Sequence, residues 1–419
     1  MKYQKYDMES YQIYTVKTDK FKNAYIEVNF REDITHVSLA KRFFLTKILQ
    51  YSTLKYPTKR EMTIELENLY NLEFLTNVSR VGMNHFTNFS VDFIHPKFVK
   101  EKDYLDQVLL FLFDALQKPN IRDGKFDEEQ MQILKERIHV SLDQYKEKPL
   151  SCARIMSKEN LFGDTEWGKR IYGTHEEIEA LTSDDLVLEY QKMWENSYCE
   201  ICIVGNLDMD EVVKKIAGIF HKSSIVSNPI SAIVFNPILP YRQEVVSSTY
   251  NQTQLVLYYQ WENVSDYERN YVAPLFCRIL GSANMTDKLT RYLRIDNSLC
   301  YYCGIIFYAT DSYANIYVGT SRENVSKALT YISKAVKEMQ KGKIDPNYFE
   351  QQKEKFLGDL KLREDDIYGL GDMYYMHEVF DRPMPLDYQE WIMKVSLEDI
   401  KKFAKKMVLV YQYVLEEGE

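Results

Sequence analysis

Two hydrophobic periods run along the chain, and they predict helices and strands in alternating groups. Apolar residues in and just before the stretch "AKRFFLTKILQYST" recur three or four positions apart, at Val37, Ala40, Phe44, Ile48 and Tyr51. This spacing is typical of a helix with one buried face. In "FTNFSVDFI", residues 86–94, apolar and polar residues alternate instead, which predicts a strand with one buried face.

The first half of the chain is predicted to contain paired strands followed by helices and one further strand. The expected strands are 11–17, 22–30, 72–80, 84–94 and a last one that ends at Asn206. The expected helices are 36–52, 59–70, 98–118, 126–147, 150–161, 183–196 and one that begins near Asp208.

The second half repeats this order of elements. Its expected strands are 243–247, 252–260, 300–310, 313–321 and 409–415, with a turn at Asp311-Ser312. Its expected helices are 266–281, 285–296, 322–342, 346–365, 367–380, 387–393 and 396–406. The repeat predicts two homologous halves, residues 1–228 and 243–419. The linker expected between them, residues 229–242, carries Pro229, Pro237 and Pro240.

The composition is that of a large soluble globular protein. A chain of 419 residues with 45% hydrophobic and 27% charged residues predicts at least two domains, because single cores rarely grow this large. The net charge of −9, with no basic stripe, argues against nucleic-acid binding. The N-terminal stretch has no apolar signal region, and no stretch approaches about 20 apolar residues. We therefore expect a cytoplasmic protein without a membrane span.

Two cysteine pairs have the C-x-x-C spacing that zinc sites use, Cys199/Cys202 and Cys300/Cys303. Both pairs lie in strand-like runs, where residues three apart point to opposite faces of a sheet. The expectation is therefore that all four are reduced thiols buried in the core rather than metal ligands.

Three local stretches carry a resemblance to a known family. "LTRYLRIDNSLCYY", residues 289–302, matches the pattern L-R-E-x-x-G-L-x-Y at Leu293, Arg294, Leu299 and Tyr301. "CIVGNLDMDEVVKKI", residues 202–216, is similar to a strand–helix segment "VVGDVDPEEV", and "FDEEQMQILKERI", residues 126–138, carries an E-x6-E spacing. With the repeated element order, these stretches resemble the pitrilysin–insulinase–mitochondrial processing peptidase family of zinc peptidases, and in particular its small bacterial subunits.

This resemblance covers nearly the whole chain and implies a fold. It implies an α+β protein of two homologous αβ halves, each a mostly antiparallel sheet covered by helices. It further implies that the halves are arranged as a clamshell, the LuxS/MPP-like fold of these zinc peptidases.

The helix that should carry the zinc site lacks its chemistry. Active relatives read close to A-H-F-L-E-H, with two histidines that hold Zn²⁺ and a glutamate that acts as general base. Aligned with that motif, this chain has Phe43 and Lys47 at the ligand positions and Thr46 at the base position. Phenylalanine offers no lone pair, and a lysine adds a positive charge beside the cation. We therefore expect no metal in this chain and no peptide hydrolysis by the chain alone.

The glutamate pair Glu129 and Glu136 stands two helical turns apart. The resemblance implies that Glu136 holds the place of the third zinc ligand. The alternative is that both are solvated acids on a helix face. Glu136-x-x-His139 also has the carboxylate–imidazole spacing of a di-iron site, but such a site needs a second copy, and the sequence has none. His139 is therefore interpreted as a partly buried polar residue.

Arg294 and Tyr301 would be the family's arginine–tyrosine pair, with Tyr302 as the alternative if the alignment shifts by one. Ile295 and Ser298 depart from the pattern, which has an acid and a glycine there. Arginine and tyrosine side chains donate hydrogen bonds to carbonyl oxygens and to a developing oxyanion. The alternative is a surface arginine and a core tyrosine with no such role.

Two functions follow from these expectations. In the first, the chain is the non-zinc subunit of a heterodimeric zinc metallopeptidase. It supplies Arg294 and Tyr301 to a paralogue that carries H-x-x-E-H and the zinc, and the substrates are leader or signalling peptides. In the second, the chain is a non-enzymatic scaffold or peptide-binding subunit of the same fold, which binds peptides by adding a strand to a sheet edge.

Overall fold

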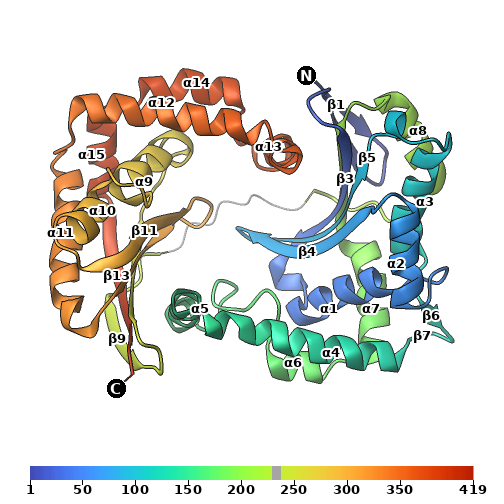
Figure 1. The fold of residues 1–419 in the computed structure, drawn as a ribbon, viewed down its shortest axis with the longest axis horizontal. Coiled ribbons are helices and arrows are strands. Elements are labelled where there is room, and N and C mark those ends of the chain that lie inside the picture. The colour runs from blue at the N-terminus through green and yellow to red at the C-terminus, as the bar shows by residue number, and fades with distance from the viewer. Residues whose placement is uncertain (229–236, 419) are drawn as a thin grey trace. The chain divides into compact units, whose positions relative to one another are not determined.

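The computed structural model describes residues 1–228 and 237–418, which form two compact units. Unit 1 holds residues 1–142, the described residues within 170–232, and residues 363–380. Unit 2 holds residues 143–169, the described residues within 233–362, and residues 381–419 apart from the last. Each unit therefore contains a segment from the other half of the sequence (Figure 1).

Unit 1 contains the strands β1 (Lys2–Asp7), β2 (Gln12–Lys17), β3 (Asn23–Asp33), β4 (Glu73–Val81), β5 (Asn84–Ile94), β6 (Ile121–Arg122), β7 (Lys125–Phe126) and β8 (Tyr198–Gly205). Its α-helices are α1 (Leu39–Tyr51), α2 (Lys59–Asn68), α3 (Tyr104–Gln117), α4 (Glu128–Asp143), α6 (His175–Glu179), α7 (Ser183–Asn196), α8 (Met209–Ile219) and α13 (Ile367–Phe380). The short 3-10 turns η1 (Ile34–His36) and η2 (Pro96–Phe98) complete it.

Unit 2 contains the strands β9 (Arg242–Ser247), β10 (Thr253–Trp261), β11 (Cys300–Tyr308), β12 (Tyr313–Thr320) and β13 (Met407–Glu416). Its α-helices are α5 (Pro149–Phe162), α9 (Ala273–Gly281), α10 (Lys288–Thr290), α11 (Val325–Gln340), α12 (Pro346–Arg363), α14 (Pro385–Lys394) and α15 (Leu397–Lys405). It also has the π-helical turns η4 (Glu268–Val272) and η5 (Arg291–Ile295), and the 3-10 turns η3 (Gln144–Glu147) and η6 (Arg322–Asn324).

The main sheets of the two units have the same strand order, except that unit 1 has β1 as an additional edge strand. Unit 1 has β1-β2-β8-β3-β5-β4, and unit 2, read in the same sense, has β9-β13-β10-β12-β11. In both, the last strand of the half makes the single parallel pairing of its sheet, β8 with β2 in unit 1 and β13 with β9 in unit 2, and the other pairings are antiparallel. The predicted α+β class, with two mostly antiparallel sheets covered by helices, is confirmed. The clamshell arrangement of the halves stays a prediction.

The predicted elements match the observed ones closely, and the misses have physical causes. Strand β1, "KYQKYD", has no apolar alternation, because it is an edge strand that pairs only with β2. The β6–β7 hairpin and the helix α6 are too short to show a hydrophobic period. The division of the sequence at residues 228 and 243 stays a prediction, and most of the predicted linker, residues 229–236, lies outside the described residues.

The two exchanged helices occupy equivalent places in the repeated order. Helix α5 follows the long helices of the first half but packs on β10 and β13 of unit 2, where Phe162 contacts Tyr258. Helix α13 follows the long helices of the second half but packs on β8, β2 and β3 of unit 1. Its residues Ile367 and Leu370 join a buried cluster with Val204 of β8. Each sheet is thus covered on its second face by a helix from the other half of the sequence.

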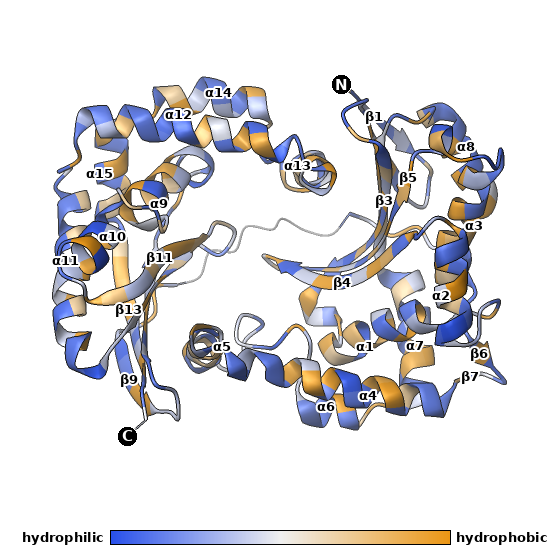
Figure 2. Ribbon diagram, in the orientation of Figure 1, coloured by the Kyte–Doolittle hydropathy of each residue, from blue (hydrophilic) through white to orange (hydrophobic). Residues whose placement is uncertain are grey.

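A buried ion pair anchors α13. The Arg31 guanidinium donates to both carboxylate oxygens of Glu200, through Nε and Nη2, at 3.0 Å each, and both side chains are almost fully buried. The Tyr375 hydroxyl of α13 donates to the same carboxylate at 2.7 Å. A buried ion pair needs every remaining lone pair satisfied, and Tyr375 meets that need. Hydrophobic and hydrophilic residues both occur along the helices that cover the sheets (Figure 2).

Replacing Tyr375 by Phe is expected to destabilise the protein by about 1–2 kcal/mol, because it removes a donor to a buried carboxylate. Urea unfolding of wild type and variant measures the difference. Tyr374→Phe is the matched control, since the Tyr374 hydroxyl is exposed and its hydrogen bond is a long one to the Met1 sulfur. Equal stabilities of wild type and Tyr375→Phe would show that α13 does not depend on this bond.

Acid is expected to destabilise the protein through His85, a fully buried residue of β5. Burial, aided by the positive charge of Arg42, lowers the pKa of His85 to about 3. In the unfolded chain His85 takes up a proton at about pH 6.5. The free energy of unfolding is therefore unaffected by His85 above that pH and decreases as the pH falls from about 6.5 toward 3. The slope is up to about 1.4 kcal/mol per pH unit.

His85→Phe is therefore predicted to flatten the loss of stability between about pH 6.5 and 4.5. Neither ring nitrogen of His85 has a hydrogen-bond partner among the described residues, so an apolar ring of similar shape loses no bond. Thermal unfolding at a series of pH values measures the slope, with His36→Gln, an exposed histidine, as control. An unchanged slope in His85→Phe contradicts this assignment.

Candidate functional site

The three positions aligned with the zinc motif lie on α1, and their side chains pack against or donate hydrogen bonds to other residues of unit 1. The Phe43 ring is buried and contacts Tyr172, with ring centroids 4.9 Å apart. The Thr46 side chain is fully buried, and its hydroxyl donates to the Phe43 carbonyl oxygen at 2.7 Å. The Lys47 ammonium donates to the carbonyl oxygen of Thr76 on β4 at 3.0 Å.

This arrangement does not fit a zinc ion. Phe43 has no donor atom, and the Thr46 hydroxyl is held by the helix backbone. Burial lowers the pKa of Lys47, but its ammonium still donates to a carbonyl and would repel a cation. Among residues 1–228 and 237–418, no cluster of three or more His, Cys, Asp or Glu residues is placed to hold a metal ion.

The face of α4 that meets α1 carries Arg137, not Glu136. A pocket beside Phe43 and Lys47 is lined on the α4 side by Leu134, Arg137, Ile138 and Ser141. Glu136 and Arg137 are both exposed, but only Arg137 is part of this lining. Successive helical residues are about 100° apart, so a one-residue difference turns the side chain away from the pocket.

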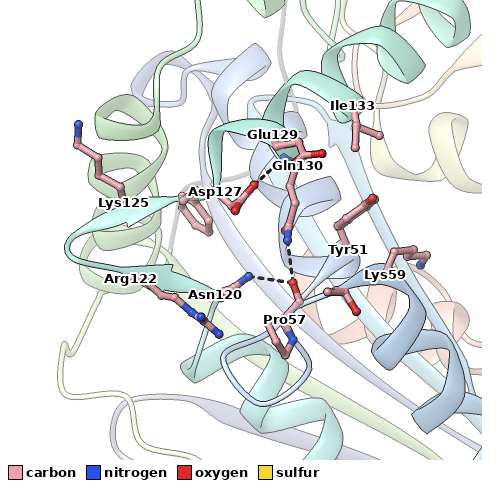
Figure 3. Close-up of a pocket in the computed structure, with 12 residues that line it drawn as sticks. Tyr51, Pro57, Lys59, Asn120, Arg122, Lys125, Asp127, Glu129, Gln130 and Ile133 are labelled. Carbon is pink, nitrogen blue, oxygen red and sulfur yellow. Dashed lines mark hydrogen bonds between the residues drawn. The ribbon is translucent and has the colours of Figure 1, made fainter.

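Glu129 lies in a second pocket, which is next to the first and shares Tyr51 and Lys59 with it (Figure 3). This pocket has a volume of about 610 Å³. Gln130 and Asn120 both donate to the carbonyl oxygen of Pro57, at 2.7 and 3.2 Å. The structure therefore places Glu129 near the α1 helix but does not bring Glu129 and Glu136 together with Phe43, Thr46 and Lys47 in one pocket.

His139 contacts another histidine. Its Nδ1 lies 2.7 Å from Nδ1 of His175, with the rings stacked, and its Nε2 lies 3.2 Å from a carboxylate oxygen of Glu179. The pairing with Glu136 that a di-iron site would need is not among these contacts.

A buried arginine beside the motif positions was not anticipated from the sequence. Arg42 is almost fully buried on α1, where it donates to Glu189 at 2.9 Å and to Glu32 at 3.0 Å. These bonds tie α1 to α7 and β3. An arginine in an amphipathic helix gives no sequence signal of burial, because its partners lie 10 and 147 residues away.

Tyr301 lies in a β-bulge at the start of the edge strand β11. The pairing with β12 shifts between Cys300 and Tyr302, so Tyr301 is the inserted residue. Its side chain is 79% exposed, as expected where a bulge turns a side chain out of the sheet. Arg294 is also exposed, on the turn just before the strand. No hydrogen bond joins either side chain to the part of the chain that the structure describes.

Tyr302 has a structural role instead. Its hydroxyl donates to the side-chain oxygen of Gln254 at 2.7 Å. A Cβ atom added at Gly319 would lie 2.5 Å from the Tyr302 ring, so the glycine gives the ring its space. Of the two neighbouring tyrosines, Tyr301 is the one with an unoccupied, solvent-facing hydroxyl.

The loop between Arg294 and Tyr301 explains the glycine of the family pattern. Ser298 adopts φ 51°, the left-handed region that glycine enters without steric cost. The backbone N–H groups of Ser298 and Leu299 donate to the carbonyls of Arg294 and Leu293, at 3.2 and 2.6 Å. This closes the turn at the end of η5, so the substitution of serine is tolerated without loss of the loop geometry.

The bulge also corrects the interpretation of one cysteine pair. Cys199 and Cys202 point to opposite faces of their sheet, as predicted, because they belong to different core clusters. Cys300 and Cys303 both lie in the core of unit 2, because the extra residue of the bulge returns them to one face. Their thiols are free.

Comparisons with known proteins agree with the resemblance. Residues 180–356 match the family model described as "Peptidase M16 inactive domain". The chain is 21% identical over 410 residues to "Probable inactive metalloprotease YmfF" of Bacillus subtilis, which covers 96% of this chain and 95% of that protein. It is 21% identical over 321 residues to "Non-peptidase homolog YmxG" of Helicobacter pylori, covering 73% and 70% of the two chains.

The fold has a solved counterpart. A conserved protein from Enterococcus faecalis V583 superposes with a TM-score of 0.91 at 21% identity, over 99% of both chains. The resemblance to this peptidase family is thus confirmed. The roles of Arg294, Tyr301, Glu129 and Glu136 stay predictions. No helix in the described residues is both long and apolar enough to cross a membrane.

The pocket geometry predicts what is needed to rebuild a zinc site. The variant Phe43→His/Thr46→Glu/Lys47→His restores the motif, yet we expect it to bind no stoichiometric zinc because Arg137 still faces the pocket. Adding Arg137→Glu supplies the third ligand and is expected to give about one zinc per chain. Metal analysis after dialysis measures this.

The control adds Glu136→Ala to the three-residue variant. If the three-residue variant holds one zinc per chain and the added Glu136→Ala substitution abolishes that binding, then Glu136 is the third ligand. The inference from the pocket would then be wrong.

Proposed function

We propose that this chain, an inactive homologue of the M16 peptidases, is the non-zinc subunit of a heterodimeric zinc metallopeptidase. The observation that supports this most is the contrast between its two units. In unit 1 the motif helix has no metal donors, whereas in unit 2 Arg294 and Tyr301 present unoccupied donor groups to solvent. A folded chain that has no zinc chemistry but still has this pair is suited to complete another subunit's site.

The chemistry fits a role for the pair in peptide hydrolysis. Attack on a peptide carbonyl develops negative charge on its oxygen, and preorganised donors at that oxygen stabilise the transition state. The guanidinium of Arg294 and the hydroxyl of Tyr301 are such donors. The bulge and the hydrogen-bonded loop at Ser298 fix the backbone at both residues. Only the side chains would then need to reorient when a peptide binds.

The partner expected from this proposal is a paralogue with an intact H-x-x-E-H motif. That partner would hold the zinc and its bound water, and this chain would contribute no metal. The substrates would be peptides, such as leader or signalling peptides, processed in the cytoplasm.

A second candidate function is a scaffold or peptide-binding subunit without enzymatic activity. The observation that favours it is that β4 and β11 are edge strands, each paired on one side only, and an extended peptide can add to such an edge. Gel filtration with and without the paralogue separates the two functions. A homodimer that ignores the paralogue supports the scaffold.

In a mixture of this chain with its zinc-bearing paralogue, Arg294→Ala is expected to lower kcat/KM for peptide cleavage by about 10²-fold, and Tyr301→Phe by about tenfold, since each removes a donor to the developing charge. A fluorogenic peptide assay measures both. Arg291→Ala changes an exposed arginine of the same turn and Tyr302→Phe the neighbouring ring, so both should leave the rate unchanged. Full activity with Arg294→Ala refutes the role of this arginine.

A further inference from the structure

The pocket between α1 and α4 is lined by several positively charged side chains. It has a volume of about 240 Å³ and is lined by Phe43, Lys47, Gln50, Tyr51, Lys59, Leu134, Arg137, Ile138 and Ser141. Three of these residues are cations, and none is an acid. They come from three different helices: Lys47 from α1, Lys59 from α2 and Arg137 from α4.

None of the three cations is paired with a carboxylate within the described part of the chain. Lys47 donates only to the backbone and hydroxyl oxygens of Thr76. Arg137 lies over the ring of Tyr51, 5.8 Å from its centroid. Lysine and arginine side chains on a protein of net charge −9 are commonly paired, so three unpaired cations around one cavity are an excess that an anion would balance.

The electrostatics of the pocket support this. Burial lowers the pKa of Lys47. Burial, together with the charge of Arg137, lowers the pKa of Lys59, so these two cations lie close enough to repel each other. Lys59 is also the first residue of α2, and the positive end of that helix dipole adds to the same potential. A bound anion would relieve the repulsion.

The remaining walls indicate what the anion is attached to. Phe43, Tyr51, Leu134 and Ile138 form apolar and aromatic surface beside the cations. A free phosphate has no apolar surface to bury against these walls. A carboxylate attached to an apolar side chain can both bind the cations through charge-assisted hydrogen bonds and bury its side chain against the walls. The C-terminal residue of a peptide has this combination of groups.

We propose that this pocket binds the carboxylate of an apolar C-terminal residue of a peptide, with Lys47, Lys59 and Arg137 holding the carboxylate and the aromatic and aliphatic walls holding the side chain. The proposal concerns α1, α2 and α4 of unit 1 and does not depend on the role of Arg294 and Tyr301. In this proposal the helix α1, which aligns with the zinc-binding helix of the family, takes part in binding an anion instead of a metal cation.

Saturation-transfer NMR with N-acetyl-leucine as the probe tests the proposal. Saturable binding is expected at up to ~10 mM ligand, with signal on the leucine methyl groups, because a small ligand with one charge binds weakly. N-acetyl-leucinamide, which lacks the charge, should give at least tenfold weaker binding. Added salt should weaken the binding of N-acetyl-leucine, because it screens the cations.

Three variants locate the site. Lys47→Met, Lys59→Met and Arg137→Met keep most of the side-chain volume and remove the charge, and each is expected to weaken binding about tenfold. Lys100→Met, an exposed lysine of the same unit, is the matched control and should bind like wild type. Unchanged thermal midpoints show that all four variants fold.

Several outcomes overturn the proposal. No saturable binding of N-acetyl-leucine, equal binding of its amide, or binding that survives all three Met variants each rules it out. Inorganic phosphate that binds as tightly as N-acetyl-leucine would show that the apolar walls contribute nothing, and would reduce the pocket to a general anion site.

Discussion

The fold depends on covering both faces of each central sheet. Strand β10 is buried along its entire length and β8 along nearly all of it, and such strands need a packed layer on both sides. The helices of each half cover only one face. The other face is closed by α13 in unit 1 and by α5 in unit 2, each taken from the other half of the sequence. Apolar burial, at about 1.5–3 kcal/mol for each large side chain, thus binds the two halves into one folded chain.

Polar anchors fix where these exchanged helices sit. Apolar surface alone is non-directional, so it gives α13 no defined register on the sheet. The bidentate pair of Arg31 and Glu200, completed by the Tyr375 hydroxyl, supplies that register. In unit 2 the corresponding helix α5 is held through Ser157, whose hydroxyl lies 3.1 Å from that of Tyr258. Each exchanged helix is therefore stabilised mainly by burial of apolar side chains, and its position on the sheet is fixed by a few directional hydrogen bonds.

The two candidate sites differ in the chemistry of the side chains that they present. On α1 the positions for metal donors hold groups that pack or donate hydrogen bonds, and the neighbouring helices contribute cations. The surroundings thus disfavour a metal ion and favour an anion. On β11, by contrast, a bulge and a left-handed serine keep an arginine and a tyrosine exposed. The two units share their strand order, and the two sites differ both in side-chain chemistry and in the local backbone that presents the side chains.

The sequence by itself determined the elements, their repetition and the residue types at the positions aligned with the zinc motif, because hydrophobic period and residue type are local properties. Its resemblance to the family pattern also singled out Arg294 and Tyr301, whose role stays a prediction. Only the tertiary structure decided that Arg137 rather than Glu136 faces α1, since one residue along a helix is a turn of about 100°. It alone revealed that α5 and α13 cover the opposite sheets, and that a bulge turns Tyr301 outward while Tyr302 packs inward. These features depend on contacts between residues far apart in the chain, which no local pattern encodes.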